Sequence, residues 1–320
     1  MLQSDGLLLA HGGGACVDEH LHLEEDTLRK PLRERLKEAS PTLVDGAMGT
    51  MLMAAGLESG MATESWNLSH PDKVLAVHRA YLEAGAEVIL TNTLGGTGRK
   101  LARSGLGDKV YEANRRGAEI ARQAAGEDAY VLGDIGSIGE FLEPLGNLSR
   151  EEAVEAFAEQ ARALRDGGVD GFLVETMSDL EEALAACEGV RLAAPELPVM
   201  CTMTFDARGR TIMGTTAQQA AQALYAFGLD ALGTNCGQGP EEMLKVIQAM
   251  AAVCPEAVLI AEPNAGTPRL VEGVTHFDAT PETMADYALQ YASAGVKIIG
   301  ACCGSTPAHI EAMAKALGKR

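Results

Sequence analysis

Short apolar segments alternate regularly with longer amphipathic segments from Thr42 to the C-terminus, and this rhythm constrains the fold more than any other feature. The segments expected to be strands are Thr42–Asp45, Glu87–Thr91, Tyr130–Asp134, Gly171–Glu175, Val199–Thr204, Ala231–Asn235, Val258–Glu262 and Val296–Gly300. Most follow one another at intervals of roughly 30–40 residues, the length of one strand–helix unit. Eight such units in roughly 275 residues predict an α/β fold of the (β/α)8 TIM-barrel type.

A doubly wound open sheet is the alternative architecture for this rhythm. It usually has fewer strands, and its dinucleotide-binding form carries a G-x-G-x-x-G motif after the first strand. The residues that follow the first apolar segment, Gly46-Ala47-Met48-Gly49, do not fit that motif. The barrel is therefore the favoured prediction.

The amphipathic segments carry helix start and stop signals. Ser149 and Glu152 are spaced as a capping box, and Gly167 is expected to end the helix that they begin. Further helix starts are predicted at Ser178 with Glu181, at Thr280-Pro281 and at Thr306-Pro307.

The composition is that of a globular protein with a sizeable core, because 47% of the 320 residues are apolar and 22% are charged. The net charge of −19 repels polyanions, so neither nucleic acid nor an anionic membrane surface is an expected partner. No apolar run approaches the ~20 residues of a membrane span. The seven cysteines are odd in number and no secretory signal is visible, so a reduced, cytoplasmic protein is expected.

Residues 1–40 differ from the rest and are expected to form an N-terminal extension to a barrel of residues 41–320. Gly12-Gly13-Gly14 is a flexible break, and the histidines and cysteine around it match no metal-binding spacing (His11, Cys16, His20 and His22). The extension is therefore predicted to be a mobile tail with one short polar helix over Asp26–Ala39. Its leucines, on one face, would pack on the barrel or on a partner (Leu28, Leu32 and Leu36).

The barrel prediction places active-site side chains at the carboxyl ends of the strands. Those ends carry Asp45, Thr91-Asn92, Asp134, Glu175, Thr204, Asn235-Cys236, Glu262 with Asn264, and Cys302-Cys303. Nearly all of these side chains are polar or thiols. Strand ends are generally polar, but chance does not easily place three cysteines at the ends of two strands.

The three cysteines at strand ends predict a metal site. Cys302 and Cys303 are adjacent, which gives poor disulfide geometry, and Cys236 ends the sixth predicted strand. In a barrel these ends face the same mouth, and three thiolates without a fourth cysteine favour zinc with an open coordination position. The alternative is that all three are small buried residues at tight turns. Other cysteines are expected to be core thiols: Cys187, Cys201 and Cys254.

An open zinc position beside three thiolates is suited to one kind of chemistry. The negative charge of the ligands makes the ion a poor activator of water. The ion can instead lower the pKa of a substrate thiol and keep it as a thiolate. Such a site predicts alkyl transfer to sulfur.

From Leu43 to about Leu317 the chain resembles the homocysteine S-methyltransferase family. The motifs that carry the resemblance are Asp45-Gly46-Ala47-Met48-Gly49-Thr50, Thr91-Asn92-Thr93, Gly133-Asp134-Ile135-Gly136, Glu175-Thr176-Met177-Ser178-Asp179, Gly233-Thr234-Asn235-Cys236, Glu262-Pro263-Asn264-Ala265-Gly266 and Gly300-Ala301-Cys302-Cys303-Gly304. Each motif alone is weak, whereas their order and spacing together are specific. The resemblance implies a (β/α)8 barrel whose catalytic zinc is bound by Cys236, Cys302 and Cys303.

Three of these motifs are most similar to the homocysteine-binding module of cobalamin-dependent methionine synthase: Thr91-Asn92-Thr93, Gly133-Asp134-Ile135-Gly136 and Glu262-Pro263-Asn264-Ala265-Gly266. The branches of the family that use S-methylmethionine or betaine carry other residues there. The chain ends at Arg320 without a pterin- or cobalamin-binding module, so the implied methyl donor is a methylcorrinoid (cobalamin) on a separate protein. The chain departs from the module at Leu94-Gly95-Gly96, where an aromatic residue is usual, and at Ser137.

The resemblance also implies roles for single residues. The side-chain oxygen of Asn264 would fill the fourth zinc position until the homocysteine sulfur replaces it. Asp45 and Glu175 would bind the substrate ammonium group. Backbone amides of the turn from Gly46 to Gly49 and of Ser178-Asp179 would bind its carboxylate.

The other polar residues at the mouth are expected to shape the substrate site rather than to take part in the chemistry (Asn235, Asn92 and Asp134). His78, in the middle of a predicted helix, and His276, in a predicted loop, are expected to be structural.

The predicted function is zinc-dependent transfer of a methyl group to the thiol of L-homocysteine, which gives methionine. Two alternatives remain open from the sequence. One is a standalone methyltransferase that uses S-methylmethionine or S-adenosylmethionine. The other is a non-catalytic subunit of a corrinoid system that binds a thiol or zinc.

Overall fold

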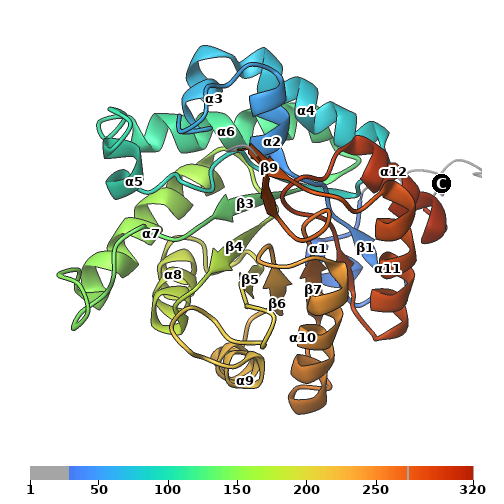
Figure 1. The fold of residues 1–320 in the computed structure, drawn as a ribbon. Helices are drawn as coiled ribbons and strands as arrows, with labels where there is room; N and C mark the ends of the chain where they lie inside the picture. Colours follow the sequence, from blue (N-terminus) through green and yellow to red (C-terminus); the bar gives the residue numbers. More distant parts are fainter. Residues whose placement is uncertain (1–28, 272–273, 320) are drawn as a thin grey trace, which may run out of the picture.

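A closed barrel of parallel strands forms the centre of the computed structural model, which describes residues 29–271 and 274–319. Its strands are β1 (Thr42–Leu43), β2 (Val88–Leu90), β3 (Tyr130–Ile135), β4 (Gly171–Met177), β5 (Val199–Met203), β6 (Ala231–Asn235), β7 (Leu259–Glu262) and β10 (Ile298–Ile299). The helices that connect them surround the strands (Figure 1).

The order of the strands shows that the barrel closes. Hydrogen-bonded neighbours run β1-β10-β7-β6-β5-β4-β3-β2, and every pairing is parallel. A parallel bridge between Val44 and Val88 joins the two ends of this order. The amide of Glu87 donates to the carbonyl of Leu43 at 2.8 Å, and the amide of Asp45 donates to the carbonyl of Val88 at 3.0 Å. The predicted (β/α)8 barrel is thus confirmed, and the open sheet is excluded.

Three of the four predicted helix starts are confirmed, at Ser149, Thr280 and Thr306. The helices in the described residues are α1 (Leu32–Arg35), α2 (Met48–Ala54), α3 (Ser65–Ser69), α4 (Pro71–Glu83), α5 (Gly98–Ala102), α6 (Val110–Ala125), α7 (Arg150–Asp166), α8 (Leu180–Ala193), α9 (Ala217–Phe227), α10 (Pro240–Val253), α11 (Pro281–Ser293) and α12 (Pro307–Ala316). Ser149 and Glu152 form the predicted capping box of α7. The predicted cap at Ser178 is wrong, because Asp179 caps α8 by accepting a hydrogen bond from the amide of Glu181 at 2.9 Å.

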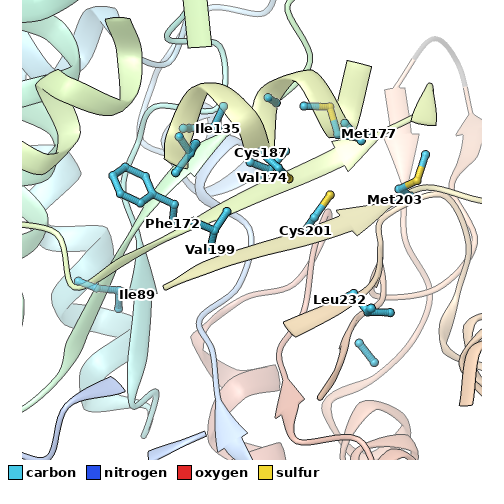
Figure 2. Close-up of a cluster of buried hydrophobic side chains, with 14 of the residues drawn as sticks. Ile89, Ile135, Phe172, Val174, Met177, Cys187, Val199, Cys201, Met203 and Leu232 are labelled. Carbon is cyan, nitrogen blue, oxygen red and sulfur yellow. The ribbon is translucent and has the colours of Figure 1, made fainter. Parts of the chain in front are cut away.

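Alternate residues of each strand face opposite sides of the barrel wall and build two cores. The outer core lies between the strands and the helices, and Figure 2 shows part of it, with Phe172, Val199 and the sulfurs of Cys187 and Cys201. The inner core fills the barrel and includes Leu132 and Ile260. Cys187, Cys201 and Cys254 are buried free thiols, which confirms their prediction as core residues.

Polar side chains continue the inward-facing series at the carboxyl ends of the strands. Two residues beyond Leu132, Leu173 and Ile260 of the inner core, the chain places Asp134, Glu175 and Glu262. All three carboxyl side chains are buried. A polar layer therefore lies on top of the apolar filling of the barrel, at the end where barrel enzymes place their active sites.

The opposite end of the barrel is closed by residues 29–41, within which the helix is shorter than predicted. Within the described residues, the helix expected over Asp26–Ala39 spans only Leu32–Arg35, and residues 26–28 lie outside them. Pro31, which lacks an amide proton and takes an extended conformation (ψ 141°), lies just before its start. Leu32 and Leu36 are buried in the inner core, and α1 lies within the ring of strands in Figure 1.

Three arginines of this segment bind acidic residues that lie just before strands. Arg29 pairs with Asp170, Arg33 with Asp230 and Arg35 with Glu87, at N–O distances of 2.5, 2.7 and 2.9 Å. The segment therefore packs on the barrel by both apolar and charged contacts. The histidines and the cysteine considered above as an N-terminal metal site, within residues 11–22, lie outside the described residues.

A short antiparallel hairpin that the sequence did not predict follows β7. Its strands are β8 (Arg269–Val271) and β9 (Val274–His276), with Arg269 opposite His276. The prediction of His276 in a loop is therefore wrong, whereas His78 lies inside α4 as predicted and is fully buried. No helix within the described residues is long and apolar enough to cross a membrane.

Candidate metal centre and substrate site

The three predicted cysteines meet at the mouth of the barrel. The sulfurs of Cys236, Cys302 and Cys303 all lie within 4.8 Å of one another. The Sγ of Cys303 is 3.9 Å from that of Cys236 and 4.0 Å from that of Cys302. A tetrahedral zinc ion with Zn–S bonds of about 2.3 Å holds its sulfurs ~3.8 Å apart, so the cluster has the size of a zinc site.

The backbone brings these sulfurs together through three neighbouring strands, β6, β7 and β10. Cys236 adopts a left-handed conformation (φ 56°) directly after β6, which turns the chain sharply and is rare for a residue other than glycine. Its amide donates to the carbonyl of Glu262 at 3.1 Å. The amide of Cys302 donates to Pro263 at 2.7 Å, and the carbonyl of Cys303 accepts from Ala265 at 3.0 Å. The segment after β7 therefore fixes both cysteine loops.

The charges of the three thiols are strongly linked. The pKa of Cys236 is lowered to about 3, because the thiols of Cys302 and Cys303 donate hydrogen bonds to its sulfur. The same interactions raise the pKa of Cys302 well above its usual range and raise the pKa of Cys303 to about 12. The three sulfurs thus share protons among themselves. A divalent cation can replace those protons as the positive partner of all three sulfurs.

Asn264 supplies an oxygen beside this cluster. Its side chain is 2% exposed and interacts with Cys236. The side-chain oxygen has no hydrogen-bond donor within the described residues. A buried amide oxygen without a partner is costly, and a bound cation would satisfy it. Three thiols and one orphaned oxygen are a donor set that fits zinc.

Four carboxyl groups lie buried beside the sulfurs at the same end of the barrel: Asp45, Asp134, Glu175 and Glu262. Burial raises the pKa of Asp45, of Asp134 and of Glu262 well above their usual ranges. Burial also raises the pKa of Glu175, to about 7, although a hydrogen bond with Asp134 opposes that shift. Within the described residues no lysine, arginine or histidine pairs with any of them. The site is therefore prepared for a cation supplied from outside.

Asn235 connects the carboxylates to the metal cluster. Its Nδ2 donates to the carboxylate of Glu175 and to Thr176 Oγ1 (2.8 Å), and it lies 4.0 Å from the sulfur of Cys302. Its Oδ1 accepts from the amide of Thr176 and from Thr202 Oγ1, both at 2.9 Å. Because both ends of this buried amide are occupied, Asn235 holds other groups in place. Thr176 is a second left-handed residue (φ 59°) at a strand end.

The turn after β1 is tied to the cysteine loop after β10. Ser305 Oγ donates to the carbonyl of Cys302 at 2.8 Å and accepts from the amide of Ala47 at 3.0 Å. A Cβ on Gly46 would lie 2.5 Å from that hydroxyl, so only glycine fits there. A Cβ added to Gly49, in the first turn of α2, would make only an ordinary contact with Thr63, 3.9 Å away.

Two further predicted residues, Ser178 and Asp45, lie at the same end of the barrel. Ser178 is partly buried in the loop between β4 and α8, beside the other site loops. Asp45 is buried and accepts a hydrogen bond from the amide of Leu90 at 3.0 Å, which uses one of its oxygens. The structure thus brings the predicted residues to one end of the barrel.

Some site residues were missed by the sequence reasoning. Glu262 was recognised at a strand end but given no role, although its position two residues beyond an inward-facing isoleucine was a usable signal. Ser305 and Thr202 act by hydrogen bonds between elements far apart in the chain, as does Tyr81, whose hydroxyl donates to the carbonyl of Ala47 at 2.9 Å. No local pattern marks such residues.

Comparisons with known proteins agree with this geometry. The family model for homocysteine S-methyltransferase matches residues 42–317. The methionine synthase of Mycobacterium tuberculosis (strain ATCC 25618 / H37Rv) is 34% identical over 323 residues, which cover 94% of this chain and 26% of the relative. The methionine synthase of Mycobacterium leprae (strain TN) is 34% identical over 296 residues, with 86% and 24% covered. The chain thus spans about a quarter of the length of these relatives.

A solved structure gives the same result in three dimensions. The metallated form of the homocysteine methyltransferase MmuM from Escherichia coli superposes with a TM-score of 0.74 at 25% identity, and the match covers 89% of this chain and 99% of MmuM. The fold, the order of the motifs and the match of residues 42–317 to the family model lead to the same assignment. This chain belongs to the homocysteine S-methyltransferase family.

Proposed function

We propose that this chain transfers a methyl group to the thiol of L-homocysteine and so forms methionine. The observation that carries the proposal is the meeting of Cys236, Cys302 and Cys303 within 4.8 Å at the barrel mouth. Beside them lies a set of buried carboxylates without a cationic partner in the described residues. A thiol-binding cation and an ammonium-binding pocket together match an amino acid that carries a thiol.

In this proposal Zn²⁺ would be held by the three sulfurs and, before substrate binds, by the side-chain oxygen of Asn264. When bound, zinc lowers the pKa of a substrate thiol and keeps it as a nucleophile at neutral pH. The similarity to MmuM, whose structure is of a metallated form, supports a metal at this site. The orphaned oxygen of Asn264 supports its place in this chain.

The other site residues bind and orient the acceptor. Asp45 and Glu175 receive its ammonium group, because both are buried carboxyl groups at the mouth. Amides of the turn from Gly46 to Gly49 and of Ser178 receive its carboxylate. Asn235 keeps Glu175 in position, as its hydrogen bonds support. The acceptor sulfur then forms a bond to the methyl carbon, while the donor keeps the electron pair of the bond that breaks.

The proposed methyl donor is a methylcorrinoid carried by a separate protein. The similarity to the two methionine synthases supports a corrinoid as the donor. Large exposed apolar side chains on the loops that follow β3, β5 and β7 also support a protein-borne donor: Phe141, Leu145, Ile212 and Leu270, with exposed fractions of 58%, 68%, 83% and 76%. These loops surround the mouth, where a partner protein could cover them.

The test is formation of methionine from L-homocysteine with each of three donors: methylcobalamin, S-methylmethionine and S-adenosylmethionine. We expect the zinc-loaded protein to use methylcobalamin. Cys302→Ala should lose both zinc and activity. Cys254→Ala is the matched control, because it removes a buried thiol at the end of α10, away from the mouth. Full activity of zinc-free protein would refute the proposed role of zinc.

The same assay separates the alternatives. Methionine from a sulfonium donor alone would identify a standalone methyltransferase. Homocysteine binding with proton release, but without transfer from any donor, would identify a binding subunit. Isothermal titration of homocysteine in the absence of donor measures that binding directly.

A further inference from the structure

Glu262 is a buried carboxyl group that nothing in the site yet uses. It ends β7, its side chain is 3% exposed, and neither carboxylate oxygen has a hydrogen-bond donor within the described residues. Leaving a buried carboxylate without partners is expensive, so such a group is retained when a ligand supplies the partner.

The side chain of Glu262 points into the barrel, toward the other carboxylates. Ile260, two residues earlier on the same strand, belongs to the inner core, so alternation directs Glu262 to the same side. A Cβ on Gly300 would lie 3.2 Å from Glu262 Cγ and 3.3 Å from the carbonyl oxygen of Asp45. Glycine at position 300 therefore leaves Glu262 room beside the turn after β1.

Glu262 lies opposite Asn235 in the strand register, and Asn235 Nδ2 donates to Glu175. Asp45 lies next to Glu262 across Gly300, so the three groups lie together at the mouth. They come from the turn after β1, from β4 and from β7, on different sides of the barrel interior. An alkylammonium group has three N–H donors directed away from its carbon. Three carboxylates around one point match those donors, whereas a carboxylate pair leaves one donor for water.

We infer that Glu262 is a third ammonium-binding carboxylate of the acceptor site, and that it makes the site selective for thiols that carry an α-amino group. The inference rests on the proposed function, since the ammonium group is that of homocysteine. Glu262 forms a charge-assisted hydrogen bond with the substrate ammonium and does not contact the sulfur or the methyl donor.

The experiment compares two ligands on the zinc-loaded full chain by isothermal titration: L-homocysteine and 4-mercaptobutanoate, which lacks only the amino group. In Glu262→Gln the Kd of homocysteine should rise about tenfold to a hundredfold, as expected for the loss of one hydrogen bond to a charged group. The Kd of 4-mercaptobutanoate should stay within about twofold, because that ligand has no ammonium group to lose.

Glu182→Gln is the matched control. Glu182 is also buried, at 6% exposure, but it accepts a hydrogen bond from the amide of Ile138 at 2.6 Å, at the start of α8. This variant should leave both Kd values unchanged. Zinc content measured for each variant shows that the metal centre is intact.

The outcomes separate the inference from the proposed function. If Glu262→Gln raises the Kd of both ligands equally, or raises neither, the role of Glu262 is overturned. Binding of homocysteine by the unaltered protein is not affected by that result. Failure of the unaltered protein to bind homocysteine overturns both. If Glu262→Gln does not fold, Glu262→Asp keeps the charge on a shorter side chain. It should reduce the preference for homocysteine over 4-mercaptobutanoate, and an unchanged preference overturns the inference.

Discussion

Shortening Leu36 to alanine should destabilise the barrel from the end opposite to the active site. Leu36 is 5% exposed and packs in the inner core with Leu32 and the inward-facing strand residues. Removing a buried leucine side chain costs about 2–5 kcal/mol of unfolding free energy, through lost apolar contact and the cavity that remains. The total stability of a domain is typically about 5–15 kcal/mol, so the loss is a large part of it.

Urea unfolding followed by the fluorescence of Trp66, the one tryptophan of the chain, measures the effect. Trp66 is buried at 5% exposure, so its emission should change when the core opens. At about 3 kcal/mol per M of urea, the unfolding midpoint should fall by about 0.7–1.7 M. Zinc content should not change, because Leu36 lies below the strands and the cysteines lie at their carboxyl ends.

Lys37→Ala is the control, since Lys37 is the next residue and is exposed. A shift of the midpoint below about 0.2 M is expected for it, as for most surface substitutions. If Leu36→Ala and Lys37→Ala gave the same midpoint, the segment before Thr42 would contribute nothing to the barrel core. The reasoning from burial would then be refuted, and a domain boundary at residue 41 would describe the molecule better.

Three further predictions concern the site and a buried histidine. Cys303→Ala should lose zinc, measured by metal analysis after dialysis against a mild chelator, because two sulfurs and one amide oxygen are left as ligands; retention of one zinc per chain would contradict the proposed ligand set. Asn235→Ala should lower the free energy of unfolding in urea by about 1–3 kcal/mol, because Glu175 and the amide of Thr176 lose their hydrogen-bond partner. The control, Thr204→Ala, removes a partly exposed hydroxyl and should lower it by less. Burial lowers the pKa of His78 from 6.5 to about 3. The folded protein therefore has its full stability above pH 6.5, where His78 is neutral in both the folded and the unfolded state. It loses stability as pH falls toward 3, because only the unfolded state takes up the proton. His78→Leu should flatten the dependence of the melting temperature on pH between about pH 6.5 and 4, and an equally steep dependence in the variant would count against this cause.

The barrel could be predicted from the sequence because its strands and helices are specified locally. Inward and outward residues of a parallel strand are both apolar, so Gly171–Val174 and Val258–Ala261 stand out as continuous apolar runs. The same regularity predicted that the three cysteines meet. Strand ends of a closed parallel barrel all meet at one mouth, so the spacing of Cys236 from Cys302 along the chain did not matter.

Other features could not be predicted because they depend on competition between distant or equivalent groups. Ser178 and Asp179 can both cap a helix, and the structure chooses Asp179, one residue later. Pro31 keeps α1 from beginning before Leu32. The network from Thr202 through Asn235 to Glu175 joins β5, β6 and β4, which are neighbours in the barrel but more than twenty residues apart in sequence. Pairing between such strands is visible only once the register is known.

The backbone of the barrel joins the loops that carry the cysteines. They follow β6 and β10, and Asn264 follows β7, which lies between those two strands. Backbone hydrogen bonds from Cys236 to Glu262 and from Cys302 to Pro263 join the three loops directly. Small zinc modules fold only when the metal binds, because the metal replaces a core. Here the core is formed by the strands and their helices, so the sulfurs are already assembled. In the proposed function, zinc therefore contributes chemistry at a preformed site, and the energy of its binding is available to hold and activate the substrate thiol.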